Sequence, residues 1–273
     1  MQIRIVSTCN AEGWKQTGRR MAETFVEHWP KQATLEVYAE GFTVDVAGVV
    51  QRQLPEWFEA WKVRHADNPD AHGRNKARFG KIDLRKGKPY SYRRDCVRFA
   101  HKVAALTDAA LNPAIVNRAA EPGWLIMCDA DVVTHATVTL DWLQSLVKDP
   151  AFYMAWLDRA AWYPECGFVV FNETHPAHVP FMTWFRDVYA TDYVFKFQET
   201  HDSFVLQQLV ARAVARGDFP KPVSLSGNDM ARRSSHPFVY SRLAERLDHA
   251  KGKFKAGGRT PRGYVKRGEA HWQ

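Results

Sequence analysis

Two aspartates follow an apolar segment in the middle of the chain. Asp129 and Asp131 come directly after Trp124-Leu-Ile-Met-Cys128, which has the composition of a buried strand. Carboxylates two residues apart at a strand end can both bind one hard divalent cation, such as Mn²⁺ or Mg²⁺, which also bridges diphosphate oxygens. Open α/β sheets bind ligands at this end of their strands. The alternative is a turn in which the aspartates hydrogen-bond the backbone.

The elements around this motif alternate between strand and helix. An early strand, helix and strand favour a parallel sheet with a crossover connection, and the length suits a single α/β domain over residues 1–273. The apolar spacing predicts strands over 3–9, 35–39, 124–128, 152–157 and 167–171, and helices over 12–29, 55–64, 93–110, 139–148, 178–190 and 202–215. Pro30 is expected to end the first helix.

Composition limits the class of protein. The 273 residues are 45% hydrophobic and 25% charged, as in ordinary soluble domains. The sequence has no apolar run long enough for a membrane span and no signal-peptide pattern. The four cysteines are scattered without a CxxC pair. We therefore expect reduced thiols, a cytoplasmic location and no membrane partner.

Basic residues are concentrated in two segments. The chain carries a net charge of +8, and residues 74–102 hold eleven Lys/Arg against two Asp. A second basic run covers residues 251–267. Such segments are suited to bind a diphosphate or a polyanion. The alternative is that they form a basic surface in contact with solvent. The candidate nucleic-acid contacts are Arg74, Lys76, Arg78, Lys81, Arg85 and Lys86.

A second motif lies near the C-terminus. His249-Ala-Lys-Gly252-Lys-Phe-Lys255 fits the pattern H-x-x-G-x-x-K. Together with the Asp-x-Asp segment, it resembles the GT-A glycosyltransferases, and in particular the retaining enzymes similar to glycogenin and to bacterial galactosyltransferases. The resemblance implies that His249 joins Asp129 and Asp131 on the metal and that Gly252 and Lys255 bind the donor diphosphate. The family pattern continues with Pro-Trp, whereas Ala256-Gly257 follows here.

The chain also resembles predicted glycosyltransferases of tailed bacteriophages over nearly its whole length. The shared segments are Ser7-Thr-Cys-Asn with Gly13-Trp14, Glu165-Cys-Gly-Phe, His201-Asp-Ser-Phe, His236-Pro-Phe-Val and Asp248-His-x-Lys-Gly. The resemblance implies a GT-A (Rossmann-like) fold with a mixed, mostly parallel central sheet flanked by helices. It also implies a nucleotide-sugar-binding half over 1–135, an acceptor half over 136–250 and a basic tail over 251–273.

Several residues are candidates for binding the donor. Ser7, Thr8 and Asn10 follow the first strand, where GT-A enzymes bind base and ribose; the alternative is a satisfied turn. Asp95 and Arg98 lie on the predicted helix that precedes the aspartate motif, and Ala130 lies between the two aspartates. Arginine grips phosphate through paired hydrogen bonds, although an exposed helix face with local ion pairs is equally compatible with this pattern.

The remaining candidates are residues for catalysis and residues for binding the acceptor. Glu165 and Asp202 are the candidate catalytic carboxylates, as a base or as a group that stabilises positive charge; Asp202 could instead cap a helix. Trp162 and Tyr163 flank a turn on the acceptor side, where aromatic faces stack on sugars and bases. His236 is a third acceptor candidate, with a structural role as the alternative.

The resulting hypothesis is a metal-dependent hexosyltransferase that uses a nucleotide sugar, most simply a UDP-sugar, with retention of configuration. The basic runs and the phage likeness suggest 5-hydroxymethyl-pyrimidine in double-stranded DNA as acceptor. A polysaccharide or protein hydroxyl is the alternative acceptor. A non-catalytic nucleic-acid-binding protein on a transferase fold is the alternative of another class.

Overall fold

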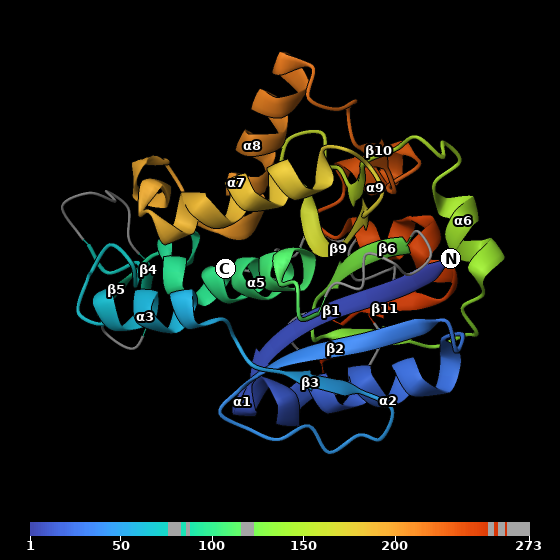
Figure 1. Ribbon diagram of the computed structural model, residues 1–273, viewed down its shortest axis with the longest axis horizontal. Helices are drawn as coiled ribbons and strands as arrows, with labels where there is room; N and C mark the ends of the chain where they lie inside the picture. Colours follow the sequence, from blue (N-terminus) through green and yellow to red (C-terminus); the bar gives the residue numbers. More distant parts are fainter. Residues whose placement is uncertain (76–82, 86–87, 116–122, 251–253, 256–259, 261–273) are drawn as a thin grey trace.

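A computed structural model of the chain describes residues 1–75, 83–85, 88–115, 123–250, 254–255 and 260 (Figure 1). Its main feature is a seven-stranded sheet in the order β10-β8-β9-β6-β1-β2-β3. The strands are β1 Gln2–Asn10, β2 Ala33–Glu40, β3 Val50–Arg52, β6 Gly123–Cys128, β8 Met154–Leu157, β9 Glu165–Asn172 and β10 Val223–Ser224. Two small sheets pair β7 Val132–Thr134 with β11 Leu247–His249, and β4 Asp83–Arg85 with β5 Lys88–Tyr90.

The large sheet is mixed and mostly parallel. Parallel pairing joins β3, β2, β1 and β6, and also β8 and β10. Strand β9 runs against both of its neighbours, β6 and β8. The predicted fold class, an α/β fold with a mixed and mostly parallel central sheet flanked by helices, is therefore confirmed.

Helices cover both faces of the sheet (Figure 1). The helical segments are α1 Ala11–Gly13, a π-helical turn Trp14–Gly18, α2 Arg19–His28, α3 Glu56–Arg64, α5 Cys96–Leu111, α6 Leu140–Leu146, α7 His178–Ala190, α8 Asp202–Arg216 and α9 Asp229–Arg233. Short 3-10 turns cover Tyr92–Arg94, Tyr193–Lys196, Pro237–Tyr240 and Arg242–Glu245. Among the described residues, the structure contains no helix with the length and apolar composition that crossing a membrane requires.

The alternation of side chains along β1 separates two cores. Ile3 and Ile5 pack on the face covered by α2, whereas Val6 packs with α5, α7 and α8 on the opposite face. Successive side chains of a strand point to opposite faces, and all six residues of β6 are buried because both faces of this strand are covered. The sheet is thus a rigid support for the residues that follow its strands.

Most predicted elements are present, with shifted ends. The predicted first helix is a continuous helical run over residues 11–28, and its last residue precedes Trp29 and Pro30 as expected. The helix predicted over 93–110 begins at Cys96, because Asp95 caps it and residues 92–94 form a separate 3-10 turn. The short strands β3, β7, β10 and β11 were not predicted, because two or three residues carry no periodic pattern.

Asp192 fastens α3 to the end of α7. Its backbone has φ 64°, in the left-handed region. Its Oδ1 accepts hydrogen bonds from Trp61 Nε1 at 2.9 Å, Arg64 at 3.1 Å and His65 Nε2 at 2.8 Å. Partial burial raises the pKa of Asp192, but the hydrogen bonds from His65, Arg64 and Trp61 outweigh it, so the pKa lies below its ordinary value.

We predict that Asp192→Ala lowers the free energy of unfolding by about 1–3 kcal/mol, because the buried Trp61 N–H loses its acceptor. Asp192→Asn is the matched control, since it keeps an oxygen and tolerates a positive φ, and it should lose less. The pKa of Asp192 is lower in the folded state, so its ionised form stabilises the native protein. The difference in free energy of unfolding between the native protein and the Asn variant should therefore be largest above about pH 5 and should shrink toward about pH 2. Urea denaturation at several pH values measures both effects; equal stability of the native and Ala proteins at pH 7 would contradict this role.

Candidate metal and donor site

One edge of the large sheet gathers the polar residues that follow its strands. Strands β1, β2 and β6 are parallel, so Asn10, Glu40 and Asp129 lie at the same edge. Strand β9 is antiparallel to β6, with Phe168 opposite Cys128, and its first residue, Glu165, therefore lies at this edge as well. The topology alone places the two aspartates and Glu165 in one region.

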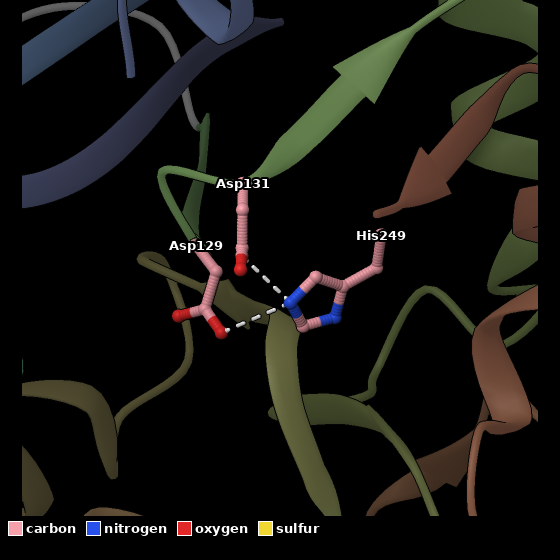
Figure 2. A group of neighbouring side chains, drawn as sticks. All are labelled: Asp129, Asp131 and His249. Atoms are coloured by element: carbon pink, nitrogen blue, oxygen red, sulfur yellow. Dashed lines mark ion pairs between the residues drawn. The ribbon is translucent and has the colours of Figure 1, made fainter. Parts of the chain in front are cut away.

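His249 reaches this region through the small sheet of β7 and β11. The antiparallel register places His249 opposite Val132, the residue that follows Asp131. A hydrogen bond from Ala250 N to Asp131 O at 3.1 Å continues this pairing. Figure 2 shows the result: the imidazole lies to one side of the two carboxylates, and one ring nitrogen faces both. This atom, Nε2, is 2.7 Å from Asp131 Oδ1 and 3.6 Å from Asp129 Oδ2.

These three side chains have the composition and spacing of a divalent-cation site. One ligand atom from each of Asp129, Asp131 and His249 lies within 4.8 Å of the others. Octahedral ligands at about 2.1 Å from a metal lie about 3 Å from their neighbours and about 4.2 Å from their opposites. Two carboxylates and one imidazole are ligands that Mn²⁺ accepts. The residues therefore fit the metal that the sequence predicts.

The imidazole of His249 is held from several sides and is only 2% exposed. His236 Nε2 lies 2.9 Å from the backbone oxygen of His249, and the ring of Phe238 packs edge-on at 5.6 Å between centroids. Nδ1 lies 3.9 Å from Glu165 Oε1. Metal-bound histidines usually donate their second N–H to a carboxylate or carbonyl. Glu165 is a nearby carboxylate, but 3.9 Å is longer than a hydrogen bond, and Nδ1 has no hydrogen-bond partner among the described residues.

Two lysines lie beside the aspartates. Lys102 Nζ on α5 is 2.7 Å from Asp129 Oδ1 and 2.7 Å from Asp202 Oδ2. Lys255 Nζ is 3.1 Å from Asp131 Oδ2. Burial lowers the pKa of Lys102, but Asp129 and Asp202 outweigh it and hold that pKa well above its ordinary value. Lys102 is therefore a permanent cation that joins the metal site to the start of α8.

Asp202 does not act as a helix cap. The N-cap of α8 is His201, whose Nδ1 accepts from Phe204 N at 3.3 Å. Asp202 is the first helical residue, is 6% exposed and points to Lys102. The structure thus brings together Asp129, Asp131, His249, Asp202 and Glu165.

The candidates on the donor side differ in their surroundings. Ser7 is fully buried, Thr8 Oγ1 donates to Tyr38 O at 2.9 Å, and Asn10 caps α1 by accepting from Gly13 N. Asp95 caps α5 and accepts from Tyr90 OH at 2.7 Å, while Arg98 is exposed. Their binding of a donor stays a prediction, as does that of Ala130, which lies between the two aspartates.

The acceptor candidates separate into two groups. Trp162 is 47% exposed, and Tyr163 is half-buried with its hydroxyl donating to Glu199 at 2.6 Å. His236, in contrast, is fully buried behind His249. Its observed role is structural, because its ring supports the backbone of His249 and has no exposed surface.

Most of the predicted nucleic-acid contacts lie outside the described residues. These are Lys76, Arg78, Lys81 and Lys86, and Gly252 of the donor motif also lies outside them. Arg74 is exposed, and Arg85 ends the short strand β4.

Two residues of the site were missed as functional positions. Lys102 ends the basic run 74–102, whose cations were expected to face phosphate, and its pairing with Asp129 and Asp202 was not predicted; its position beside Val103 and Ala104, which are buried, was the available signal. Gly167 was not singled out, yet a Cβ at this position would lie 2.6 Å from His249 Nδ1 and 3.4 Å from Asp129 Oδ2. The absence of a side chain at Gly167 makes room for the imidazole.

Comparisons with known proteins give structural likeness only. No protein-family model and no curated protein matches the chain. Mouse xyloside xylosyltransferase 1 is 9% identical, with a TM-score of 0.47 over 83% of this chain and 86% of that one. The galactosyltransferase LgtC is 13% identical (TM-score 0.38, 81% and 72% covered). A glycosyltransferase involved in glycosylation of the major capsid of PBCV-1 is 12% identical (TM-score 0.40, 94% and 97% covered). All three are sugar transferases by name.

We predict that Gly167→Ala displaces the imidazole of His249 and weakens Mn²⁺ binding by at least about tenfold. This is the loss of metal affinity expected when a residue that orients a metal ligand is changed. Isothermal titration with MnCl₂ measures the affinity, and circular dichroism verifies the fold.

The control is a double-variant cycle with His249→Ala. In that background the methyl group has no ring to displace, so Gly167→Ala should cause no further loss. Native affinity in the single variant, or an equal loss in both backgrounds, would show that Gly167 does not act through His249.

Proposed function

We propose that this protein is a metal-dependent glycosyltransferase of the GT-A type, which transfers a sugar from a nucleotide diphosphate donor to a hydroxyl group. The observation that carries the proposal is the convergence of Asp129, Asp131 and His249 at the carboxyl edge of the sheet. A pair of carboxylates and one imidazole beside a cationic tail lysine is suited to a divalent metal and a diphosphate. The expected metal is Mn²⁺ or Mg²⁺, and the expected donor is a UDP-sugar.

The bound metal would stabilise the negative charge that develops on the leaving nucleotide diphosphate. Asp129, Asp131 and His249 hold it, and Lys255, 3.1 Å from Asp131, adds a second positive charge on the diphosphate side. Gly252 belongs to the same motif and is proposed to let the tail approach the diphosphate closely. Ser7, Thr8, Asn10, Asp95, Arg98 and Ala130 are the proposed contacts of the remaining donor groups.

Asp202 and Glu165 are the proposed carboxylates at the reacting sugar. Asp202 is fixed by Lys102 at 2.7 Å, which suits a group that orients the donor sugar and stabilises positive charge at its anomeric carbon. This role is compatible with the retaining outcome that the sequence motif implies. Glu165 lies 3.9 Å from His249 Nδ1 and directly follows the loop that carries Trp162, and its proposed role is to contact the reacting sugar.

Two acceptor classes follow from the sequence. A 5-hydroxymethyl-pyrimidine in DNA would depend on the basic residues 74–86, most of which lie outside the described residues. A saccharide would depend on Trp162 and Tyr163, which lie on the loop that precedes Glu165. We favour the saccharide, because the arginines beside Trp162 already have carboxylate partners.

We predict that Asp129→Asn, Asp131→Asn and His249→Ala each lower the affinity for Mn²⁺ by at least about 100-fold, because each removes a ligand. Donor hydrolysis with Mn²⁺, screened over several UDP-sugars, should fall in parallel. Asp141→Asn is the control, since Asp141 is exposed on α6. Native Mn²⁺ affinity in all three variants would remove the metal assignment.

We predict that Lys255→Met has opposite effects on metal and on nucleotide. Without the ammonium group beside Asp131, Mn²⁺ alone should bind about 3–10-fold tighter, because a competing cation is gone. UDP should bind the Mn²⁺-loaded protein about tenfold more weakly, because a charged contact to its diphosphate is lost. Titrations with MnCl₂ and with UDP measure both, with Lys148→Met on the exposed surface as control; unchanged UDP affinity would exclude the diphosphate role.

A further inference from the structure

A groove of about 580 Å³ lies beside the loop that joins β8 to β9. Its volume is in the range of about 300–1,000 Å³ that is typical of small-molecule sites. It is lined by Arg93, Arg159, Ala160, Ala161, Trp162, Tyr163 and Gln207. We refer to these residues as the Trp162 groove.

The walls of the groove are fixed by a half-buried carboxylate. Glu199, whose side chain is 15% exposed, accepts from Tyr163 OH at 2.6 Å and from Arg93 at 3.2 Å. Burial and the adjacent Glu199 raise the pKa of Tyr163 to about 12, so its hydroxyl stays protonated. Arg159 is held by backbone oxygens, with Nε 2.6 Å from Tyr163 O. The groove is therefore shaped before a ligand binds.

The groove is adjacent to the metal site. Arg159, which lines it, lies 3.9 Å from Glu165 Oε2, and the other oxygen of Glu165 lies 3.9 Å from His249 Nδ1. Trp162 is three residues before Glu165, so their Cα atoms are at most about 11 Å apart. One acceptor molecule can contact Trp162 and still present a hydroxyl near the donor.

The chemistry of the lining suits a sugar ring. Trp162 has the exposed aromatic surface, and the negative face of an aromatic ring attracts the weakly positive C–H groups on one side of a sugar. Gln207 and Arg93 add planar polar groups that can hydrogen-bond hydroxyls. The arrangement has the mixture of aromatic surface and a few polar groups found in ligand sites.

The charge of the lining argues against a phosphodiester. Both cations of the groove have a carboxylate partner, since Arg93 is paired with Glu199 at 3.2 Å and Arg159 lies 3.9 Å from Glu165. Binding a polyanion requires cations whose charge is not already compensated. Among the described residues that line the groove, the charges therefore favour a neutral ligand.

From these observations we infer that the Trp162 groove is the acceptor subsite and that the acceptor is a neutral saccharide, one ring of which stacks on Trp162. This inference rests on the proposed glycosyltransferase function and specifies its acceptor. Arg93 and Gln207 are the proposed hydrogen-bonding partners of the hydroxyl groups of that ring.

Saturation-transfer NMR with methyl α-glucoside, lactose and cellobiose tests the inference, in the presence of Mn²⁺ and UDP. We expect at least one of these saccharides to bind the native protein. Trp162→Ala should weaken that binding by about tenfold or more, and Gln207→Ala should weaken it measurably. Tyr193→Ala removes an aromatic side chain that is 40% exposed on the 3-10 turn after α7, and it should bind like the native protein.

The readouts separate this inference from the proposed function. Trp162→Ala should keep native affinity for Mn²⁺ and UDP, and Tyr193→Ala should keep native donor hydrolysis. Equal saccharide binding by the native and Trp162→Ala proteins would overturn the inference, and so would binding of none of the three saccharides. Preferential binding of a duplex containing 5-hydroxymethylcytosine would overturn it in favour of DNA. Loss of Mn²⁺ and UDP binding in the native protein would instead reject the glycosyltransferase proposal.

Discussion

The candidate metal site depends on one long-range contact, the approach of the His249 imidazole to the carboxylates of Asp129 and Asp131. Backbone pairing of β11 with β7 sets it, because the register puts His249 opposite the residue that follows Asp131. The large sheet positions the aspartates on the other side of this contact, since β6 ends directly before Asp129. Gly167 on β9 leaves the space that the ring occupies. Three separate segments thus position three ligand atoms.

The negative charge of this site has protein cations as partners. Lys102 joins Asp129 to Asp202, and Lys255 lies against Asp131. Unpaired carboxylates close together repel one another, and buried charges are costly without partners. The two lysines differ in exposure, because the side chain of Lys102 is 19% exposed on α5 and that of Lys255 is 40% exposed. Lys102 is suited to hold the site together, and Lys255 has more side-chain surface open to a ligand.

Sequence patterns predicted the sheet and most helices, because elements longer than about five residues repeat their apolar positions often enough to be recognised. The aspartate motif was recognised for the same reason, since a long apolar strand precedes Asp129. The pairing of β11 with β7 was not predictable from periodicity, as each strand has three residues; the distant His249 was recognised only through its motif. The ion pair of Lys102 with Asp202 depends on the packing of α5 beside α8, which no local pattern reports. His236 has the residue type of a binding group, and only its burial reveals the supporting position.

The most direct measurement of the central claim is a crystal structure with Mn²⁺ and UDP, with anomalous scattering recorded at the manganese edge. The account predicts one manganese peak coordinated by Asp129, Asp131 and Nε2 of His249, with the UDP diphosphate on its open side. A manganese peak elsewhere, or a UDP molecule bound away from these three side chains, would contradict it.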